Sequence, residues 1–205
     1  MIKVEGIEVW GFPHAIRGMR NPLNSWDKID SKYCGAEYVI GDNDLGLMRR
    51  LYKAGTEHRK YLRQIFVSMD ITAPLYWWKE FDTYKVGTVS NSCSTMHKIH
   101  EKEFTLDDFS HEHMDKGTCN VLESVIEMLN CDREMYLENK RLKTYWWNMI
   151  QLLPSSYNQR RTITMSYENV MTIINQRSNH KLDEWHDLIA ELRKLPYVNE
   201  IRGEK

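Results

Sequence analysis

The chain contains 205 residues, and its 28 lysines and arginines nearly balance 29 aspartates and glutamates, which leaves a formal charge of -1. It lacks the basic excess of proteins that coat nucleic acid, and no apolar segment is long enough to cross a bilayer, so we expect neither nucleic acid nor a membrane as a partner. A hydrophobic fraction of 41% suits one globular domain over residues 1–205, because no repeat or Gly/Ser-rich linker marks a boundary.

The cysteines and the N-terminus both indicate a cytoplasmic protein. Cys34, Cys93, Cys119 and Cys131 are scattered without a Cys-x-x-Cys pair, which favours reduced thiols over a disulfide framework. The first ten residues alternate like a strand and carry acids where a signal peptide needs an apolar run. We therefore expect the mature chain to start here.

The first forty residues combine clear signals with a segment that has none. The opening twelve residues favour a strand, and His14–Arg20 predicts a short helix, with two arginines on one face, that Asn21-Pro22 ends. Residues 21–41 keep no period and are rich in turn-forming residues, so they indicate a loop.

A helix and a strand follow. Asp42-Asn-Asp44 is typical of a helix start, apolar residues recur after it at helical spacing, and Gly55 is well placed to stop the helix. Residues 62–71 then alternate between apolar and polar side chains, which predicts a half-buried strand.

This strand leads into a short aromatic helix. Thr72 is placed to cap the helix, Pro74 is tolerated in its first turn, and Trp77 and Trp78 belong to its apolar face. The small hydroxyl and amide residues of Lys85–Ser94 then indicate a polar loop. Amphipathic runs over Thr118–Leu152 predict long helices, and the mixture of strands and helices predicts an α+β domain.

Two histidine pairs have the spacing of metal ligands. His97-x-x-His100 and His111-Glu-His113 could each bring two imidazoles to one ion. Such pairs recur by chance and no thiolate pair accompanies them, so we predict no metal site.

The stretch from Ala73-Pro74 to His97 resembles the flavin-dependent thymidylate synthases, whose helix after an Ala-Pro step leads into the signature R-H-R-x-x-S-x-N-x-x-S-x-R-Y. Thr83-Tyr84-Lys85 falls on the first three signature positions, so lysine alone matches a basic residue. With one slipped residue, Asn91 and Ser94 fall on the N-x-x-S portion.

Two later blocks and one earlier turn extend the resemblance. Leu153-Pro154 resembles the leucine-proline turn in which an arginine seven residues after the leucine binds the nucleotide, and Arg160 occupies that place. Arg177, His180 and Glu184 keep the spacing of the family's final helix. Gly55-Thr-Glu-His58 resembles the turn that contacts the flavin.

The resemblance implies a central, mostly antiparallel sheet flanked by long helices, and four subunits with active sites between chains. It implies reductive methylation of deoxyuridine monophosphate (dUMP) to dTMP by methylenetetrahydrofolate, with FAD reduced by NADPH. The tryptophan pairs Trp77-Trp78 and Trp146-Trp147 are candidate anchors for the subunit interfaces of such a tetramer.

The same resemblance assigns roles to eight residues. Arg177 is the catalytic candidate, because a planar guanidinium stabilises negative charge on the uracil carbonyl oxygens when carbon 5 becomes nucleophilic. The candidates for nucleotide binding are Arg160, Lys85, Asn91 and Ser94. The candidates for cofactor binding are His58, His180 and Glu184.

Three alternatives stay open. Thr83-Tyr84 cannot supply the charge of the family signature, so the chain could be a non-catalytic pyrimidine-nucleotide-binding protein that has lost the flavin clamp. It could also be an enzyme that acts on a different pyrimidine nucleotide. Finally, Arg177 could serve a structural ion pair with Glu184 on the helix face.

Overall fold

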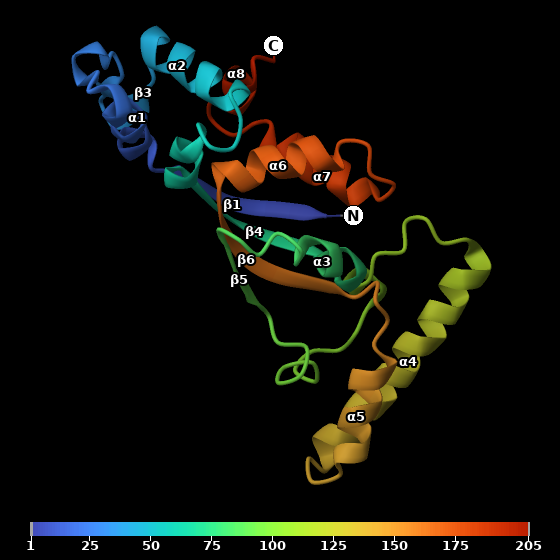
Figure 1. Ribbon diagram of the computed structural model, residues 1–205. Coiled ribbons are helices and arrows are strands. Elements are labelled where there is room, and N and C mark those ends of the chain that lie inside the picture. The colour runs from blue at the N-terminus through green and yellow to red at the C-terminus, as the bar shows by residue number, and fades with distance from the viewer. Residues whose placement is uncertain (1, 205) are drawn as a thin grey trace. The chain divides into compact units, whose positions relative to one another are not determined.

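A computed structural model describes residues 2–204 of the chain. The protein is an α+β structure with a central antiparallel sheet flanked by helices, as the sequence predicted. The sheet has the strand order β1 (Lys3–Trp10), β4 (Phe66–Pro74), β6 (Asn158–Ser166), β5 (Thr88–Ser92), shown in Figure 1.

By its internal contacts the chain divides into two compact units. We call the first the hairpin unit, after its pair of long helices; of the described residues it contains Ile71–Thr83, Asn91–Thr162 and residues 2–3. The second, the terminal unit, contains Val4–Asp70, Tyr84–Ser90 and residues 163–204.

Strand β4 follows the predicted alternation. The side chains of Ile65, Val67, Met69 and Ile71 are fully or almost fully buried, and the residues between them are partly exposed. The strand begins at Phe66, later than predicted, because residues Lys60–Gln64 form a 3-10 helix in which Leu62 is already buried. Alternation therefore located the strand, and the 3-10 turn shortened it.

The terminal unit is built from helices around a core of large side chains. Its helices are α1 (Phe12–Arg20), α2 (Asp42–Lys53), α6 (Tyr167–Arg177), α7 (Asp183–Leu192) and α8 (Val198–Arg202). Figure 1 shows α2 beside α8 and α6 beside α7. Phe12, expected at the end of the first strand, instead begins α1, where its buried ring meets Tyr167 and Tyr197 edge to face.

The segment 21–41 is not the simple loop that was expected. It contains two 3-10 turns and an antiparallel hairpin of β2 (Lys32–Cys34) and β3 (Glu37–Val39). Gly35 reverses the chain with a φ of 65°, a conformation that glycine adopts without strain. The β2–β3 hairpin, which belongs to the terminal unit, leaves most of its side chains exposed. No buried face therefore imposed an alternating pattern on its sequence.

The hairpin unit contains α3 (Leu75–Phe81), α4 (Lys116–Glu138) and α5 (Lys143–Leu152), and α4 and α5 lie side by side in Figure 1. Both long helices were predicted. They close over a separate apolar core, whose buried members are Ile99, Phe104, Phe109, Leu122, Ile126, Leu129 and Met149.

The start of α3 differs from the prediction. Thr72 does not cap it, since β4 continues to Pro74 and the proline itself takes the extended N-cap conformation. The backbone N–H groups of Leu75 and Tyr76 donate to the carbonyl oxygens of Tyr157 and Ser155, both at 3.0 Å. These bonds satisfy donors that a helix start otherwise leaves open, so no capping side chain is needed.

The two tryptophans of α3 cannot anchor a subunit interface. Trp77 and Trp78 are 0% exposed and pack edge to face at 4.9 Å between ring centroids. That part of the expected interface is wrong, because these rings are core. Trp147 is 50% exposed, so its role in an assembly stays a prediction.

The polar stretch Lys85–Ser94 is not all loop either. Its central residues form β5, and the amide of Cys93 donates to the carbonyl oxygen of Arg160 at 2.9 Å, just beyond the strand. Because β5 lies at the edge of the sheet and is largely exposed, it needs no apolar residues and its sequence resembles a loop.

The sequence led us to expect no membrane span, no metal site and no disulfide, and the structure describes residues 2–204 in these respects as follows. Within residues 2–204, no helix has the length and apolar character of a membrane span. Across the same range, no group of three or more His, Cys, Asp or Glu side chains could hold a metal ion. All four cysteines are free thiols.

Candidate nucleotide and cofactor sites

The hairpin unit holds a cavity of about 490 Å³, which we call the hairpin cavity. It lies where β4 ends and β6 begins, and the segment after β5 closes it. Its lining is formed by Thr72, Cys93, Ser94, Thr95, Lys98, Ile99, Glu101, Lys102, Phe104, Asp107, Asp108, Tyr157, Asn158, Gln159 and Arg160.

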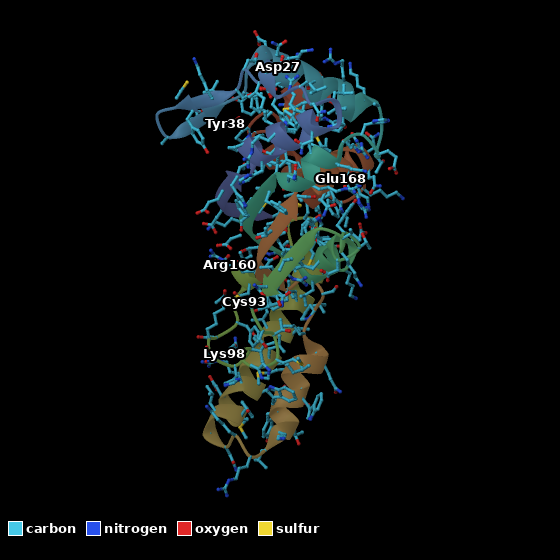
Figure 2. The ribbon with its side chains drawn as sticks, turned by 60° about the vertical axis from the view of Figure 1, so that its left-hand side comes forward. Asp27, Tyr38, Cys93, Lys98, Arg160 and Glu168 are labelled. Atoms are coloured by element: carbon cyan, nitrogen blue, oxygen red, sulfur yellow. The ribbon has the colours of Figure 1, made fainter. Side chains whose placement is uncertain are left out.

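Two of the four predicted nucleotide-binding residues meet in this cavity, namely Arg160 and Ser94. Figure 2 shows Arg160, Cys93 and Lys98 along one side of the unit. The other two do not join them in the lining as described for residues 2–204. Asn91 is an exposed residue of β5, and Lys85 is exposed and belongs to the terminal unit. The nucleotide-binding roles of Lys85 and Asn91 stay predictions.

Hydrogen bonds fix several residues that line the hairpin cavity. The amide of Gln159, a buried residue, donates to the carbonyl oxygen of Cys93 at 2.7 Å, and the Ser110 hydroxyl donates to Asn158 at 2.9 Å. Ser94 accepts from the backbone amide of His97 at 3.0 Å. The polar groups that face the cavity therefore start from fixed backbone positions.

Charges of both signs line the cavity. Lys98 pairs with Glu101 and Lys102 pairs with Asp108. The hydrogen bond to Asp108 raises the pKa of Lys102, so this amine stays charged at neutral pH. Burial, and then the negative charge of Asp108, raise the pKa of Tyr157, so its phenol stays neutral and can donate a hydrogen bond. The lining thus offers cations and a neutral donor to an anionic ligand.

Sequence reasoning did not identify Arg161, the neighbour of Arg160. Its guanidinium carbon lies 4.2 Å from the centroid of the Trp78 ring, and the group donates to Asp82 at 2.8 Å and Gln159 at 2.9 Å. Successive residues of a strand point to opposite faces, so Arg160 and Arg161 face apart. A cation stacked on a buried indole braces β6 against α3.

The terminal unit brings two other predicted residues, Arg177 and His180, against the ring of Trp185, and a third, Glu184, precedes Trp185 in the chain. Arg177, the last residue of α6, places its guanidinium carbon 4.7 Å from the centroid of the indole ring. The His180 ring meets the same indole at 6.1 Å, and its Nδ1 accepts from the backbone amide of Leu182 at 3.2 Å. Glu184, in the first turn of α7, is buried. The spacing of Arg177, His180 and Glu184 therefore reflects one local cluster.

Tyr84 completes this cluster, at the position where the family signature has a histidine. Its hydroxyl accepts from Nε of Arg177 at 2.9 Å and donates to Gln176 at 3.0 Å. The guanidinium is thus held against two rings and a hydroxyl. An orientation fixed in this way is what electrostatic stabilisation of a developing oxyanion requires.

His58 lines a second large cavity, of about 780 Å³, in the terminal unit, which we call the terminal cavity. Its lining combines basic groups with apolar ones, and Glu57 is its acid. The basic members are Arg20, Lys28, Arg50, Lys60 and His58. The apolar members include Met19, Pro22, Leu23, Leu47 and Leu51.

Arg20, one of the two arginines on one face of the predicted first helix, is buried. Its guanidinium donates to Oδ1 of Asp44 from Nε at 2.9 Å and from Nη2 at 2.6 Å, and to the carbonyl oxygen of Lys28 at 3.1 Å. Asp44 is 0% exposed, and its other oxygen accepts from the backbone amides of Asp30 and Ser31 and from the Ser31 hydroxyl. This pair ties α1 to α2 and fixes the segment between them.

Asp30 performs the capping that was assigned to Asp42-Asn-Asp44. Its carboxylate accepts from the backbone amides of Asn43 and Asp44 at 2.8 and 3.0 Å, and Gly41 takes the N-cap position. Burial opposes ionisation of this carboxyl, but the hydrogen bonds outweigh it and lower the pKa of Asp30. No local sequence signal pointed to this cap, because it comes from outside the helix.

The sheet and its flanking helices match the fold of solved flavin-dependent thymidylate synthases. The chain superposes on the crystal structure of the flavin-dependent thymidylate synthase ThyX from Helicobacter pylori complexed with FAD and dUMP. The TM-score is 0.71 at 15% sequence identity, and the match covers 98% of this chain and 97% of that chain.

A second structure of the Helicobacter pylori enzyme with FAD and dUMP gives a TM-score of 0.69 at 15% identity, with the same coverage. The UMP/dUMP methylase PolB from Streptomyces cacaoi, bound with 5-Br UMP, gives 0.59 at 14% identity and covers 98% of this chain and 93% of that chain. No protein-family model and no curated protein matches the sequence. At these identities the comparisons establish the fold.

Proposed function

We propose that the protein is a pyrimidine-nucleotide methylase of the flavin-dependent type, which converts dUMP to dTMP. The observation that carries the proposal is the match over 98% of the chain to enzymes whose solved structures hold a pyrimidine nucleotide. Methylenetetrahydrofolate would supply the carbon and NADPH the reducing equivalents. The free thiols agree with a cytoplasmic enzyme.

The hairpin cavity is the proposed nucleotide site. Arg160 would bind the phosphate, since a guanidinium meets phosphate oxygens with two parallel donors, and Ser94 would add a hydroxyl. A nucleotide phosphate would compete with Glu101 for Lys98. When this exposed ion pair opens, Lys98 becomes the third cation of the site, after Arg160 and Lys102. Lys85 and Asn91 remain proposals as further contacts.

Arg177 is the proposed catalytic residue. A uracil ring attacks from carbon 5 only if charge that develops on its carbonyl oxygens is stabilised, and Tyr84 and Trp185 orient the guanidinium for that task. His180 contacts the same indole, so it would hold the bound cofactor from a ring position that this cluster already fixes, and the buried Glu184 is proposed for the same role.

The terminal cavity fits the chemistry of a flavin dinucleotide. Its basic side chains suit a pyrophosphate, its apolar side chains suit flat rings, and about 780 Å³ is within the range of small-molecule sites. His58, Arg50 and Lys28 would hold FAD there. When bound, FAD supplies the hydride chemistry that the protein's own side chains lack.

A non-catalytic nucleotide-binding protein is the second candidate. Thr83 and Tyr84 stand where the family signature has charged residues, and both are engaged within the protein. The Thr83 hydroxyl donates to the carbonyl oxygen of Glu80 at 2.7 Å, and Tyr84 holds Arg177. Neither side chain offers the flavin a charge.

The visible absorbance spectrum of the purified protein separates the two candidates. Flavin bands and formation of dTMP from dUMP, with methylenetetrahydrofolate and NADPH, are expected for the enzyme. A colourless protein that still binds dUMP and stays inactive after addition of FAD would contradict the methylase and support the binding protein.

Calorimetric titration with dUMP tests the site itself. We expect Arg160→Gln to weaken binding by roughly one to two decades, the range for a hydrogen bond to a charged group. Arg141→Gln is the matched control, since Arg141 is an exposed arginine of the same unit outside the cavity lining described here. Equal affinity in both variants would remove the hairpin cavity as the nucleotide site.

Assembly into a tetramer is proposed on the same basis as the reaction. Light scattering at micromolar concentration should give four times the chain mass of 24.5 kDa. A monomeric mass would contradict it and would require each active site to be complete within one chain.

A further inference from the structure

A third cavity, of about 370 Å³, lies in the hairpin unit, and we call it the tryptophan cavity. Five of its seven lining side chains are aromatic or imidazole rings. The lining is formed by Met96, His97, His100, Tyr136, Lys143, Trp146 and Trp147. The proposed nucleotide and flavin sites use none of these residues, and Trp146 and Trp147 were considered only as candidate anchors of a subunit interface.

The rings of the tryptophan cavity stand at steep angles to one another. Trp146 and Trp147 have centroids 4.7 Å apart with ring planes at 71°, and His100 and Tyr136 have centroids 5.0 Å apart with planes at 77°. Trp146 is held by a hydrogen bond from its indole nitrogen to the carbonyl oxygen of Met96 at 2.9 Å. Trp147 is 50% exposed and so presents a large free ring surface. A flat ligand can stack on that surface without displacing the core.

His100 supplies a polar group without a partner. Within residues 2–204, its Nδ1 atom is buried and has no hydrogen-bond partner. Burial, and then the charge of Lys140, lower the pKa of His100, so its imidazole is neutral at physiological pH and offers one donor and one acceptor. A buried polar atom left unsatisfied destabilises the protein, and a ligand heteroatom would remove that penalty if the imidazole turned to bring Nδ1 to the cavity.

The surroundings of the cavity are positive. Lys143 belongs to the lining, and Lys140, Lys98 and Arg133 all act electrostatically on His100, opposed by Glu101. An anionic group near the rim of the cavity would therefore be favoured over a neutral or cationic one.

From this arrangement we propose that the tryptophan cavity binds a flat heteroaromatic ring system that carries an anionic group. The ring stacks on Trp147, a ring heteroatom hydrogen-bonds to His100, and the anionic group meets Lys143. Pterin carboxylates and purine nucleotides share this chemistry. The inference does not depend on the methylase proposal.

Calorimetry of the full-length protein with pterin-6-carboxylate and with adenosine monophosphate, each in the presence of excess dUMP, tests the site. The excess dUMP occupies the hairpin cavity if that cavity binds nucleotides. Trp147→Ala should weaken binding roughly 5- to 150-fold, the range for loss of one ring stacked on an aromatic side chain. Trp10→Ala, which removes a 45% exposed tryptophan of the terminal unit, should leave affinity unchanged.

His100→Phe isolates the hydrogen bond, because it keeps a ring and removes both nitrogens. We expect roughly 2- to 10-fold weaker binding and a melting temperature no lower than that of the wild type, because the substitution also removes the unsatisfied buried nitrogen. Binding of one probe and not the other supports the site and identifies its ligand class. No binding of either probe at millimolar concentration, or full affinity in a folded Trp147→Ala protein, would overturn the proposal. Titration of dUMP alone tests the methylase separately.

Discussion

Replacement of Asp44 by alanine should destabilise the protein more than most single substitutions. The change removes the acceptor of two hydrogen bonds from Arg20, whose side chain is 5% exposed, and leaves a guanidinium buried beside a cavity. It also removes the acceptor for the backbone amides of Asp30 and Ser31 and for the Ser31 hydroxyl. The substitution therefore removes both the ion pair and the hydrogen bonds that hold the segment between α1 and α2.

The magnitude follows from the burial of both partners. Removal of one member of a buried ion pair destabilises a protein by about 3–5 kcal/mol, because the remaining charge has no compensation. For a chain of this size, 1 kcal/mol lowers the melting temperature by about 2–4 °C, so we expect a fall of roughly 6–20 °C. Asp187→Ala is the control: Asp187 is an exposed residue of α7, and its loss should change the free energy of unfolding by less than about 0.5 kcal/mol.

Urea unfolding of the wild type, Asp44→Ala, Asp187→Ala and the double variant Arg20→Met/Asp44→Leu measures the free energy of unfolding directly. The double variant should regain the part of the loss that comes from the unpaired guanidinium, because apolar side chains of similar size replace buried ion pairs well, whereas the amides of Asp30 and Ser31 still lack their acceptor. A loss below about 1 kcal/mol in Asp44→Ala would refute the reasoning, since it would mean that Arg20 reaches water when its partner is absent.

The remaining predictions concern the proposed catalytic side chain, two glycines and one carboxyl. Arg177→Ala should lower turnover of dUMP by roughly 10²–10³-fold, with little change in melting temperature, in a steady-state assay; a large fall in melting temperature with unaltered kinetics would make Arg177 structural. Gly41→Ala should destabilise the protein, because the new Cβ would lie 2.2 Å from the carboxyl carbon that caps α2. Gly46→Ala meets no atom within 4 Å and should stabilise the same helix by about 1 kcal/mol, so equal thermal melts would contradict both. The hydrogen bond from Arg202 lowers the pKa of Glu204 from 4.5 to about 2, so its contribution to stability is complete above pH 4.5 and is lost as pH falls toward 2. Glu204→Gln should therefore be less stable than wild type at neutral pH and equal to it near pH 2 in denaturant titrations.

Patterns that depend on a buried face could be read from the sequence. The alternation of residues 62–71 located β4, Gly55 marked the end of α2, and the amphipathic runs of Thr118–Leu152 located both long helices. In each case burial of one face restricts the residue types along the chain, so a local window contains the information.

Features fixed by distant partners could not be read in this way. The cap of α2 comes from Asp30, the first amides of α3 bond to the carbonyl oxygens of Tyr157 and Ser155, and Arg20 is buried only because Asp44 meets it. A window of ten residues contains one partner of each pair and not the other.

The candidate sites show the same difference between residues that are close in the chain and residues that only the fold brings together. Arg160 and Ser94 line one cavity, and Arg177 and His180 share one indole. The roles proposed for them await the kinetic and binding measurements. Short spacing along the chain kept the second pair together, whereas the basic lining around Lys98 and Lys102 had no counterpart in the motif that the sequence resembles.

The two units are interleaved along the chain, and this has a consequence for how the protein is made. Each unit draws on several separated segments, and the ring of Phe12 in α1 packs on Tyr167, more than 150 positions later. An emerging chain on the ribosome cannot complete either unit until most of the message has been translated. Contacts of such long sequence separation fold slowly, and exposed apolar helices would wait for their partners meanwhile. Slow synthesis would therefore not help α1 to fold early, and chaperone binding to the N-terminal segment should persist until Tyr167 has left the exit tunnel.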